Sequence, residues 1–319
     1  MKFSIITPMY NSFSLMGPYF ESLVSQTYKN FEVIIIDDCS TDDSYNHLMT
    51  YKENSSLDIV LLKTKRNSGP GLARNLGLEK VIGKYVMFID SDDYIDFHCL
   101  KEISDTILNT GADCVMFDYY KRRGESIIHG STIPGFEQGA INQKLAIANA
   151  NGSMCCKVYR TENIKFNGAK FPDILRFEDM VFNKRSLVYC NNIHYIKKPL
   201  YYYISNESSI VNNKKNASEK YAIEAFQTLE KELKNKFPNE IETIFVREML
   251  YSTVLTLVSN RARRKNIIHH IKSLESSYPN WNKNDGIKNF AFHQKVFLKL
   301  IQFRIIWGLR LMAYIRKKI

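Results

Sequence analysis

The stretch YVMFIDSDD at residues 85–93 is decisive for the fold, because it joins an apolar run directly to a cluster of carboxylates. The nearly continuous apolar run FEVIII at residues 31–36 also ends on carboxylates. Such runs are typical of strands that are buried on both faces of a parallel sheet. Shorter runs at 3–7 and 59–62 predict two more strands, with helical patterns between them. The alternation predicts an α/β fold, with a mostly parallel, Rossmann-like sheet and flanking helices.

A polar cluster follows each of the four predicted strands. The clusters are TPMYN at 7–11, DDCSTD at 37–42, NSGPG at 67–71 and DSDD at 90–93. Ligands of open α/β sheets bind outside the carboxyl ends of the strands. The four clusters therefore predict one binding site along that edge of the sheet.

The segment Asp90-Ser91-Asp92 has two interpretations. Hard cations such as Mg²⁺ and Mn²⁺ prefer oxygen ligands, and they commonly use one or two carboxylates together with substrate phosphate oxygens. A metal that bridges a diphosphate would offset the charge that builds on a leaving group. The alternative is a solvated acidic turn before the helix near Phe97, since aspartate favours helix N-termini.

Two other groups on this edge are equally open to a structural interpretation. Asp38 could accept a hydrogen bond from a nucleobase N–H, or it could belong to the turn that starts the next helix, with Ser40 or Thr41 as the cap. Arg74 lies on the first turn of a helix that points at the site edge, where it could contact a diphosphate. Taken alone, it would be interpreted as an ordinary surface arginine.

The pair Glu178-Asp179 stands at the start of a predicted helix over 179–188. Direct displacement at a sugar carbon needs a base that deprotonates the acceptor hydroxyl. The alternative is an acidic first turn that stabilises the helix dipole. Spacing alone leaves both open.

Together these residues resemble a family 2 glycosyltransferase of the GT-A fold. The resemblance is carried by TPMYN at 7–11, DDCSTD at 37–42, NSGPGLARN at 67–75, FIDSDD at 88–93 and ED at 178–179. It covers roughly the first two thirds of the chain. Each motif is weak by itself, but the ordered set is specific. The family implies transfer of a sugar from a nucleotide diphosphate donor, UDP above all, with inversion in one step.

The resemblance also implies roles for individual residues. It places the contacts to the nucleotide sugar at Thr7, Pro8, Tyr10, Asp38, Asn67, Arg74, Asp90 and Ser91. Within this set, Asp38 would contact the base and Arg74 the donor phosphate or sugar. Asp92 would bind Mn²⁺ or Mg²⁺, and Asp179 would be the catalytic base with Glu178 beside it.

Two departures from the family pattern bear on this assignment. Cys39 stands where glycine is commonest, and we expect it to alter the turn little. The segment YYYIS at 201–205 lacks the basic residue that often follows such tyrosines in relatives. Closure over a diphosphate would then depend on weak contributions from Ser208 or Ser209.

The chain divides into three predicted regions. Residues 1–95 form the nucleotide-sugar-binding half of the GT-A domain, and residues 96–212 form the acceptor-binding half. A polar segment at 212–216 leads into a helical region at 213–319, with helices predicted at 217–233, 241–258, 266–274 and 290–316.

The last predicted helix is basic and amphipathic. Residues 292–319 contain seven Lys or Arg and no acidic residue. As one helix, this segment would align an apolar face with a basic stripe, at Phe292, Val296, Leu300, Phe303, Trp307, Leu311 and Tyr314 and at Lys295, Lys299, Arg310 and Lys317. This composition fits an interfacial helix on an anionic membrane, whereas the alternative is a helix packed on its neighbours.

Bulk composition limits the compartment and the partners. The chain carries 44 Lys and Arg against 33 Asp and Glu, for a net charge of +11, which suggests a polyanionic partner. The six cysteines have neither zinc-ligand nor Cys-x-x-Cys spacing, and the N-terminus does not read as a signal peptide. We therefore expect a cytoplasmic protein at the inner face of the membrane, acting on a glycan or polyprenyl-linked acceptor of a bacterial surface polysaccharide or capsule.

Two rival functions remain at this point. The basic charge and the 19 Tyr and 19 Phe residues would suit a nucleic-acid-binding protein, but no nucleic-acid motif occurs and the strand-end carboxylates would repel phosphates. The other rival is a membrane-surface scaffold with little catalytic activity. Nucleic acid is therefore not an expected partner.

Overall fold

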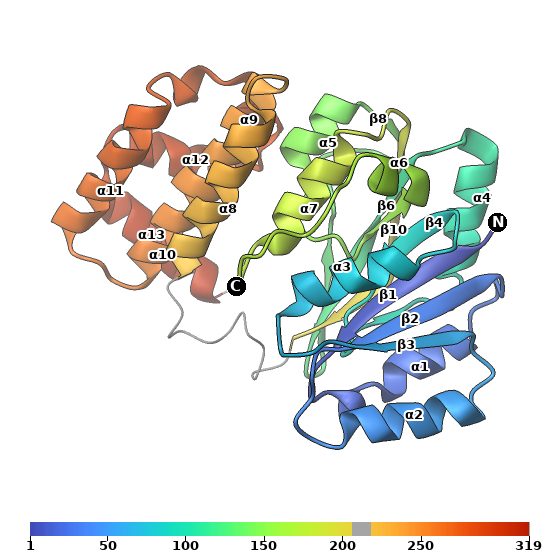
Figure 1. The fold of residues 1–319 in the computed structure, drawn as a ribbon. Helices are drawn as coiled ribbons and strands as arrows, with labels where there is room; N and C mark the ends of the chain where they lie inside the picture. The colour runs from blue at the N-terminus through green and yellow to red at the C-terminus, as the bar shows by residue number, and fades with distance from the viewer. Residues whose placement is uncertain (206–217, 319) are drawn as a thin grey trace. The chain divides into compact units, whose positions relative to one another are not determined.

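The computed structural model describes residues 1–205 and 218–318, and the chain forms two compact units (Figure 1). The sheet unit comprises Met1–Thr132, Glu137–Gln143 and Asn151–Asn216. The helical unit comprises Ile133–Phe136, Lys144–Ala150 and Ala217–Ile319. Ser208, Ser209 and the polar segment at 212–216, which figured in the sequence interpretation, lie outside the described residues.

The first four strands form the predicted parallel sheet, in the order β3-β2-β1-β4. They are β1 (Phe3–Met9), β2 (Phe31–Asp37), β3 (Ile59–Lys63) and β4 (Tyr85–Phe88). The connecting helices are α1 (Gly17–Val24), α2 (Ser44–Asn54) and α3 (Pro70–Lys80). Every residue of β1, β2 and β4 is buried, as their apolar runs predict.

The course of the chain locates a switch point between β1 and β4. From β1 the chain moves outward through β2 to β3, and it then crosses back over β1 to reach β4. Because crossovers between parallel strands are right-handed, α1 and α2 cover one face of the sheet and α3 covers the other (Figure 1). In open α/β sheets ligands bind at such a switch point, which in this chain lies at the carboxyl ends of β1 and β4.

Helix α3 packs unusually close to the sheet. A Cβ atom at Gly77 would lie 2.8 Å from a side-chain atom of Ile36 and 2.9 Å from one of Ile6. Glycine therefore allows the helix to approach β1 and β2. This contact places Arg74, one turn earlier on α3, at the edge of the site.

Beyond β4 the sheet becomes mixed. The strands β5 (Tyr94–Ile95), β6 (Cys114–Arg123), β7 (Ser126–Gly130), β8 (Gly139–Ile141), β9 (Lys157–Arg160) and β10 (Ile193–Ile204) complete it. Strand β9 runs antiparallel to both β4 and β6, whereas β10 is parallel to β6. The parallel arrangement thus holds for the four strands that carry the motifs and for the β6–β10 pair, but not for the whole sheet.

Four helices lie between these strands in the sequence. They are α4 (Cys99–Thr110), α5 (Gln143–Asn149), α6 (Thr161–Phe166) and α7 (Glu178–Leu187). Apart from its first residue, α5 belongs to the helical unit. Helix α7 confirms the predicted helix at 179–188.

The helical unit contains the predicted helices, with one correction. Its elements are α8 (Ser218–Leu233), α9 (Pro238–Ile244), the π-helix η3 (Phe245–Thr253), α10 (Val254–Ser259), α11 (Arg264–Ser277), the short 3₁₀ turns η4 (Trp281–Lys283) and η5 (Asp285–Asn289), α12 (Phe292–Gln302) and α13 (Ile306–Lys318). The prediction of one helix over 290–316 is wrong, because the chain breaks between α12 and α13. Arg304 adopts a left-handed φ of 58° there, and its guanidinium forms an ion pair with Glu275.

Among residues 1–205 and 218–318, none of the helices is both long and apolar enough to span a bilayer.

Candidate functional site

The loop after β4 carries carboxylates in two different environments. Asp93 is 1% exposed and accepts hydrogen bonds from the Tyr201 hydroxyl at 2.6 Å and from the Ile204 backbone N–H at 2.7 Å. Burial raises its pKa well above the ordinary range. Asp90 and Asp92 are partly exposed on the same loop. Asp93 therefore anchors the loop to β10, whereas Asp90 and Asp92 lie nearer to the solvent at the strand ends.

Arg74 joins this loop to α7. Only 4% of Arg74 is exposed, and its Nη2 donates to Asp90 Oδ1 at 2.5 Å while Nη1 donates to Glu178 Oε1 at 3.3 Å. Burial alone would lower its pKa, but the charges of Asp90 and Glu178 raise it, so the guanidinium stays charged. The structure excludes the interpretation of Arg74 as an ordinary surface arginine.

The two carboxylates at the start of α7, Glu178 and Asp179, have different partners. Burial, reinforced by the charge of Asp179, raises the pKa of Glu178 to about 7, and Glu178 is committed to Arg74. Burial also raises the pKa of Asp179, and its Oδ1 accepts the Met180 backbone N–H at 2.7 Å. Phe177, just before the pair, has a left-handed φ of 65°, a strained conformation of the kind that collects at functional sites.

Gly71 allows α3 to approach α7. A Cβ atom at this position would lie 2.8 Å from Cγ of Glu178. The glycine-rich motif is therefore required for helix packing as well as for its turn. It brings Arg74 within reach of Glu178, which lies 104 residues away in sequence.

The Asp38 carboxylate accepts hydrogen bonds from other residues of the protein. Asp38 is 3% exposed, and it accepts hydrogen bonds from the Thr64 hydroxyl at 2.8 Å, from the Ser68 N–H and hydroxyl at 3.1 and 3.0 Å, and from the Gly69 N–H at 2.7 Å. These bonds hold the loop that precedes α3. Asp38 thus shapes this edge of the site, and its contact with a base stays a prediction.

Hydrogen bonds join the loop after β1 to the loop after β2, a contact that the sequence did not predict. Asn11 accepts the Thr41 N–H at 2.8 Å, and its own N–H donates to the Ser40 hydroxyl at 2.9 Å. Ser40 and Thr41 therefore bind Asn11 and do not cap α2. At the start of α2 it is Asp42 that accepts the Ser44 N–H, at 3.0 Å.

Four predicted nucleoside contacts differ in accessibility. Tyr10 is 44% exposed and Asn67 is exposed, so both can meet a ligand. Thr7 is fully buried and its hydroxyl shares a 2.7 Å hydrogen bond with the Tyr19 hydroxyl, and Pro8 is buried in β1. The Thr7 side chain faces the core, so a contact through its hydroxyl is not supported.

Ser91 and Cys39 complete the placement of the predicted residues. The Ser91 hydroxyl lies 2.9 Å from the Ser12 hydroxyl, which ties the loops after β4 and β1 together. Cys39 has a φ of 62°, in the left-handed region that glycine adopts without strain. The turn survives the cysteine, but only with a strained backbone.

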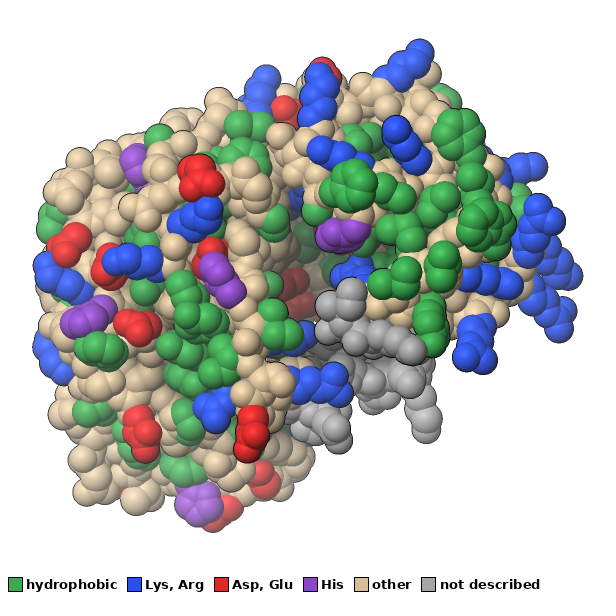
Figure 2. Space-filling model, turned by 180° about the vertical axis from the view of Figure 1, so that it is seen from behind, with side chains coloured by type: hydrophobic (Ala, Val, Ile, Leu, Met, Phe, Trp, Pro, Cys, Tyr) green, Lys and Arg blue, Asp and Glu red, His purple; other side chains and the backbone are tan. Residues whose placement is uncertain are grey.

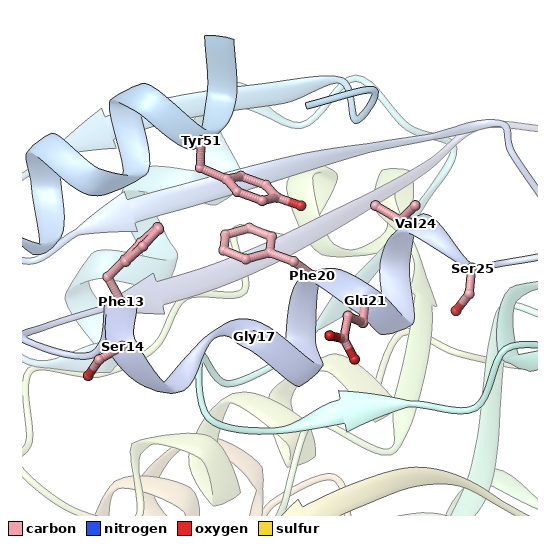
Figure 3. A pocket seen from close by; sticks show the side chains of 8 residues that line it. All are labelled: Phe13, Ser14, Gly17, Phe20, Glu21, Val24, Ser25 and Tyr51. Atoms are coloured by element: carbon pink, nitrogen blue, oxygen red, sulfur yellow. The ribbon is translucent and has the colours of Figure 1, made fainter. Parts of the chain in front are cut away.

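A surface depression of about 600 Å³ lies elsewhere on the sheet unit, between α1 and α2 (Figure 3). The Phe20 and Tyr51 rings stack within it with their centroids 3.8 Å apart. Its lining residues are Phe13, Ser14, Gly17, Phe20, Glu21, Val24, Ser25 and Tyr51. None of the predicted site residues lines it, so it is separate from the strand-end site.

The sequence of this chain matches the profile of a known protein family. The profile of glycosyl transferase family 2 covers residues 4–166, about half of the chain, including the motifs at the ends of β1 to β4. The chain belongs to glycosyl transferase family 2.

Two curated relatives of this family 2 chain are named as poly(ribitol-phosphate) glycosyltransferases. The chain is 32% identical over 209 residues to the poly(ribitol-phosphate) β-N-acetylglucosaminyltransferase TarS of Staphylococcus aureus, which covers 64% of the chain and 35% of TarS. It is 30% identical over 210 residues to the poly(ribitol-phosphate) β-glucosyltransferase of Bacillus spizizenii, which covers 64% of the chain and 32% of that protein. The chain matches about a third of the length of these relatives.

Solved structures confirm the GT-A fold of the family 2 chain. The structure of S. aureus TarS 1-349 in complex with UDP-GlcNAc has a TM-score of 0.74 at 23% identity, and the match covers 100% of this chain and 92% of that one. The complex of the same protein with UDP has a TM-score of 0.71 with the same coverage.

A divalent metal at this site would have to take most of its ligands from the substrate and from water. Within the described part of the chain, no three His, Cys, Asp or Glu residues form a group that could hold a metal ion. Asp90 is already bound to Arg74, which leaves Asp92 as the predicted carboxylate ligand. One hard carboxylate with diphosphate oxygens and waters suits Mg²⁺ or Mn²⁺.

Proposed function

We propose that this family 2 chain is an inverting glycosyltransferase, which moves a sugar from a UDP-sugar to a hydroxyl group of a glycan. The proposal depends above all on one observation. Arg74 binds Asp90 and Glu178 together, and so brings the predicted donor loop and the predicted base to one place at the switch point of the sheet.

In this proposal, Asp179 removes the proton of the acceptor hydroxyl. The acceptor oxygen then forms a bond to the anomeric carbon on the face opposite the leaving UDP, while the bond between that carbon and the diphosphate oxygen breaks. The proton ends on the Asp179 carboxylate. Attack from the opposite face inverts the configuration, and no covalent intermediate with the protein is needed.

The other residues position the donor. The exposed Tyr10 ring and Asn67 are suited to meet the nucleoside, and Asn67 lies on the loop that Asp38 holds in place. Asp92 would hold Mn²⁺ or Mg²⁺ together with the diphosphate, where the metal would offset the charge on the departing UDP. Arg74 keeps Asp90 oriented, and its charge partly compensates the acidic cluster.

The relatives support the choice of donor and acceptor class. Their names specify N-acetylglucosamine or glucose transfer to poly(ribitol-phosphate), and TarS binds UDP-GlcNAc. A polyol-phosphate polymer is a polyanion, which agrees with the net charge of +11. We therefore propose a UDP-hexose or UDP-N-acetylhexosamine as donor, and a hydroxyl of an anionic or lipid-linked bacterial surface polysaccharide as acceptor.

Donor hydrolysis tests the proposal directly. The intact protein should release UDP from a UDP-sugar in the presence of Mn²⁺, and it should be much slower with dTDP- and GDP-sugars. Release of the nucleotide is measured for each donor with and without the metal. Absence of hydrolysis for every donor, together with binding of the protein to single-stranded nucleic acid, would favour the nucleic-acid rival.

The last helix of the helical unit, α13, exposes apolar side chains on one face. Trp307, Leu311, Tyr314 and Ile315 lie on the exposed face of α13, with exposed fractions between 47% and 74%. Ile306, Leu309 and Ala313 are buried on the opposite face. The exposed apolar face therefore survives the break between α12 and α13, although the predicted stripe does not run along one helix.

Basic side chains accompany this face. Lys299, Arg310 and Arg316 are exposed, and Lys and Arg side chains lie beside apolar ones on this side of the helical unit (Figure 2). Each basic residue near an anionic surface contributes about 1 kcal/mol of binding. We propose that α13 docks on the anionic inner face of the cytoplasmic membrane.

Vesicle binding should depend on the exposed face of α13. The variant Trp307→Glu/Leu311→Glu should lose binding to vesicles of phosphatidylglycerol and phosphatidylcholine, and high salt should weaken binding by the unaltered chain. Sedimentation with the vesicles measures both effects. The matched control is Ile82→Glu/Leu108→Glu, which alters two residues of the sheet unit that are 70% and 72% exposed. If the unaltered chain ignores the vesicles, or if both variants lose binding equally, α13 is not a membrane-docking helix.

A further inference from the structure

Lys157 is a fully buried lysine that the proposed reaction does not use. It lies in β9 with 0% of its surface exposed. Its Nζ donates to Asn151 Oδ1 at 3.0 Å, to Asn151 O at 3.3 Å and to Ser153 O. Burial lowers its pKa to about 8. A buried ammonium group is costly unless its hydrogen bonds are satisfied, and here all three are directed to the loop at 151–153.

Helix α7 binds the same loop from the other side. Asn183 is fully buried, and its Nδ2 donates to Asn151 O at 2.7 Å and to Gly152 O at 3.4 Å. Its Oδ1 accepts the Tyr159 hydroxyl at 3.0 Å. Lys157 and Asn183 therefore share the carbonyl of Asn151. Asn183 lies one turn after Asp179, so the two side chains project from the same side of α7.

The loop also reaches the DSDD segment. Sγ of Cys155 lies 3.7 Å from Asp90 Oδ2. At Gly152, an added Cβ atom would lie 3.1 Å from Cβ of Met180, so the loop packs directly against the first turn of α7. The segment 151–155 thus contacts both the donor side of the site, at Asp90, and the base side, at α7.

We propose that Lys157 and Asn183 are positioning residues, which hold the loop at 151–155 and thereby set the position of Asp179 relative to the donor. The inference rests on the proposed function, in which Asp179 is the base. Displacing a catalytic group by about 1 Å can cost a factor of 10² in rate. A lysine suits this position because its ammonium group can donate to three oxygens that no neutral side chain of similar shape could satisfy together.

The variant Lys157→Met keeps most of the length of the side chain and removes the three hydrogen bonds that Lys157 donates to the loop. Its kcat for glycosyl transfer should fall by a factor on the order of 10 to 10², because the base is no longer held in place. The KM for the donor and the affinity for UDP should change by less than about threefold, since Lys157 binds Asn151 and Ser153 and makes no hydrogen bond to Asp90 or to the nucleoside loops. The control Lys101→Met removes a lysine that is 53% exposed on α4, and it should change neither quantity.

A double variant tests whether Lys157 acts through Asp179. If it does, Lys157→Met/Asp179→Asn should be no slower than Asp179→Asn alone, because the base that Lys157 positions is already lost. Effects that multiply, or a normal kcat in Lys157→Met, would overturn the positioning role while leaving Asp179 as the base. Near-normal turnover by Asp179→Asn would instead overturn the proposed mechanism.

A milder change covers the case in which Lys157→Met does not fold. Tyr159→Phe removes only the hydroxyl that donates to Asn183, and its folding is checked by a cooperative thermal transition. We expect kcat to fall a few-fold, again without any further loss in the Asp179→Asn background. An unchanged kcat, or a further loss in that background, would count against the network.

Discussion

Turnover by the Asp179→Asn variant should be slower than that of the unaltered chain by a factor on the order of 10² to 10⁴, the range expected when a general base is lost. The amide keeps the shape of the carboxylate but cannot accept the acceptor's proton at neutral pH. Its carbonyl can still accept the Met180 N–H, so α7 should begin as before. Affinity for UDP should therefore be nearly unchanged. Single-turnover transfer rates and UDP titrations measure the two effects separately.

The pH dependence of transfer gives a second measure of the same residue. A general base works as the carboxylate, so the rate should fall as the pH drops through its pKa. Burial raises the pKa of Asp179, and it raises that of Glu178 to about 7, so this fall should come at a higher pH than for an ordinary aspartate near 4. The two carboxyl groups titrate as a pair, so the fall in rate at low pH reflects the protonation of both. It should be absent from the residual activity of Asp179→Asn.

Two comparisons make the result specific. Asp173→Asn alters an exposed aspartate shortly before α7 and should leave the rate unchanged. Near-normal turnover by Asp179→Asn would transfer the role of base to Glu178, in spite of its ion pair with Arg74.

Asp92→Asn should reduce turnover by a factor of about 10² or more and make the binding of UDP insensitive to Mn²⁺. A metal on the diphosphate contributes several kcal/mol to the departure of UDP, and about 1.4 kcal/mol corresponds to a tenfold change in rate. Asp92 is partly exposed, so the fold should survive the change. Calorimetric titration with UDP, with and without Mn²⁺, measures the metal dependence.

The surface aspartate Asp58 provides the control for this variant. It pairs with Lys2 at 2.9 Å while 61% exposed, and such surface pairs contribute little. Asp58→Asn should therefore keep both activity and metal dependence. Full activity of the unaltered chain in excess EDTA would disprove the metal assignment for Asp92.

The parallel first half of the sheet was predictable because its signals are local. A strand buried on both faces needs an apolar run, and β2 and β4 are such runs of neighbouring residues. The turn at the end of each strand collects polar residues within a few positions. Parallel order then follows from the alternation with helices. Antiparallel β9 has no comparable local signal, because its lysine would suit a solvent-facing strand equally well.

The break in the C-terminal helix shows what a local pattern misses. The apolar spacing from Phe292 to Tyr314 is compatible with one helix. The break depends on the ion pair of Arg304 with Glu275, on another helix, and on a left-handed backbone at Arg304. Contacts of this range leave no trace in helical periodicity.

Sequence alone determined which residues would gather at the strand ends, since chain order and strand direction suffice to bring those residues to one edge of the sheet. Tertiary structure decided what each of them does there. Arg74 is buried because Asp90 and Glu178, far apart in the chain, both bind it, and Asp38 holds a loop because Ser68 and Gly69 donate to it. Lys157 can be buried as an ammonium group because Asn151 and Ser153 accept its hydrogen bonds. The physical reason is that the pattern of apolar and polar residues depends on neighbours along the chain. The charge state, burial and pairing of a side chain depend instead on its neighbours in space.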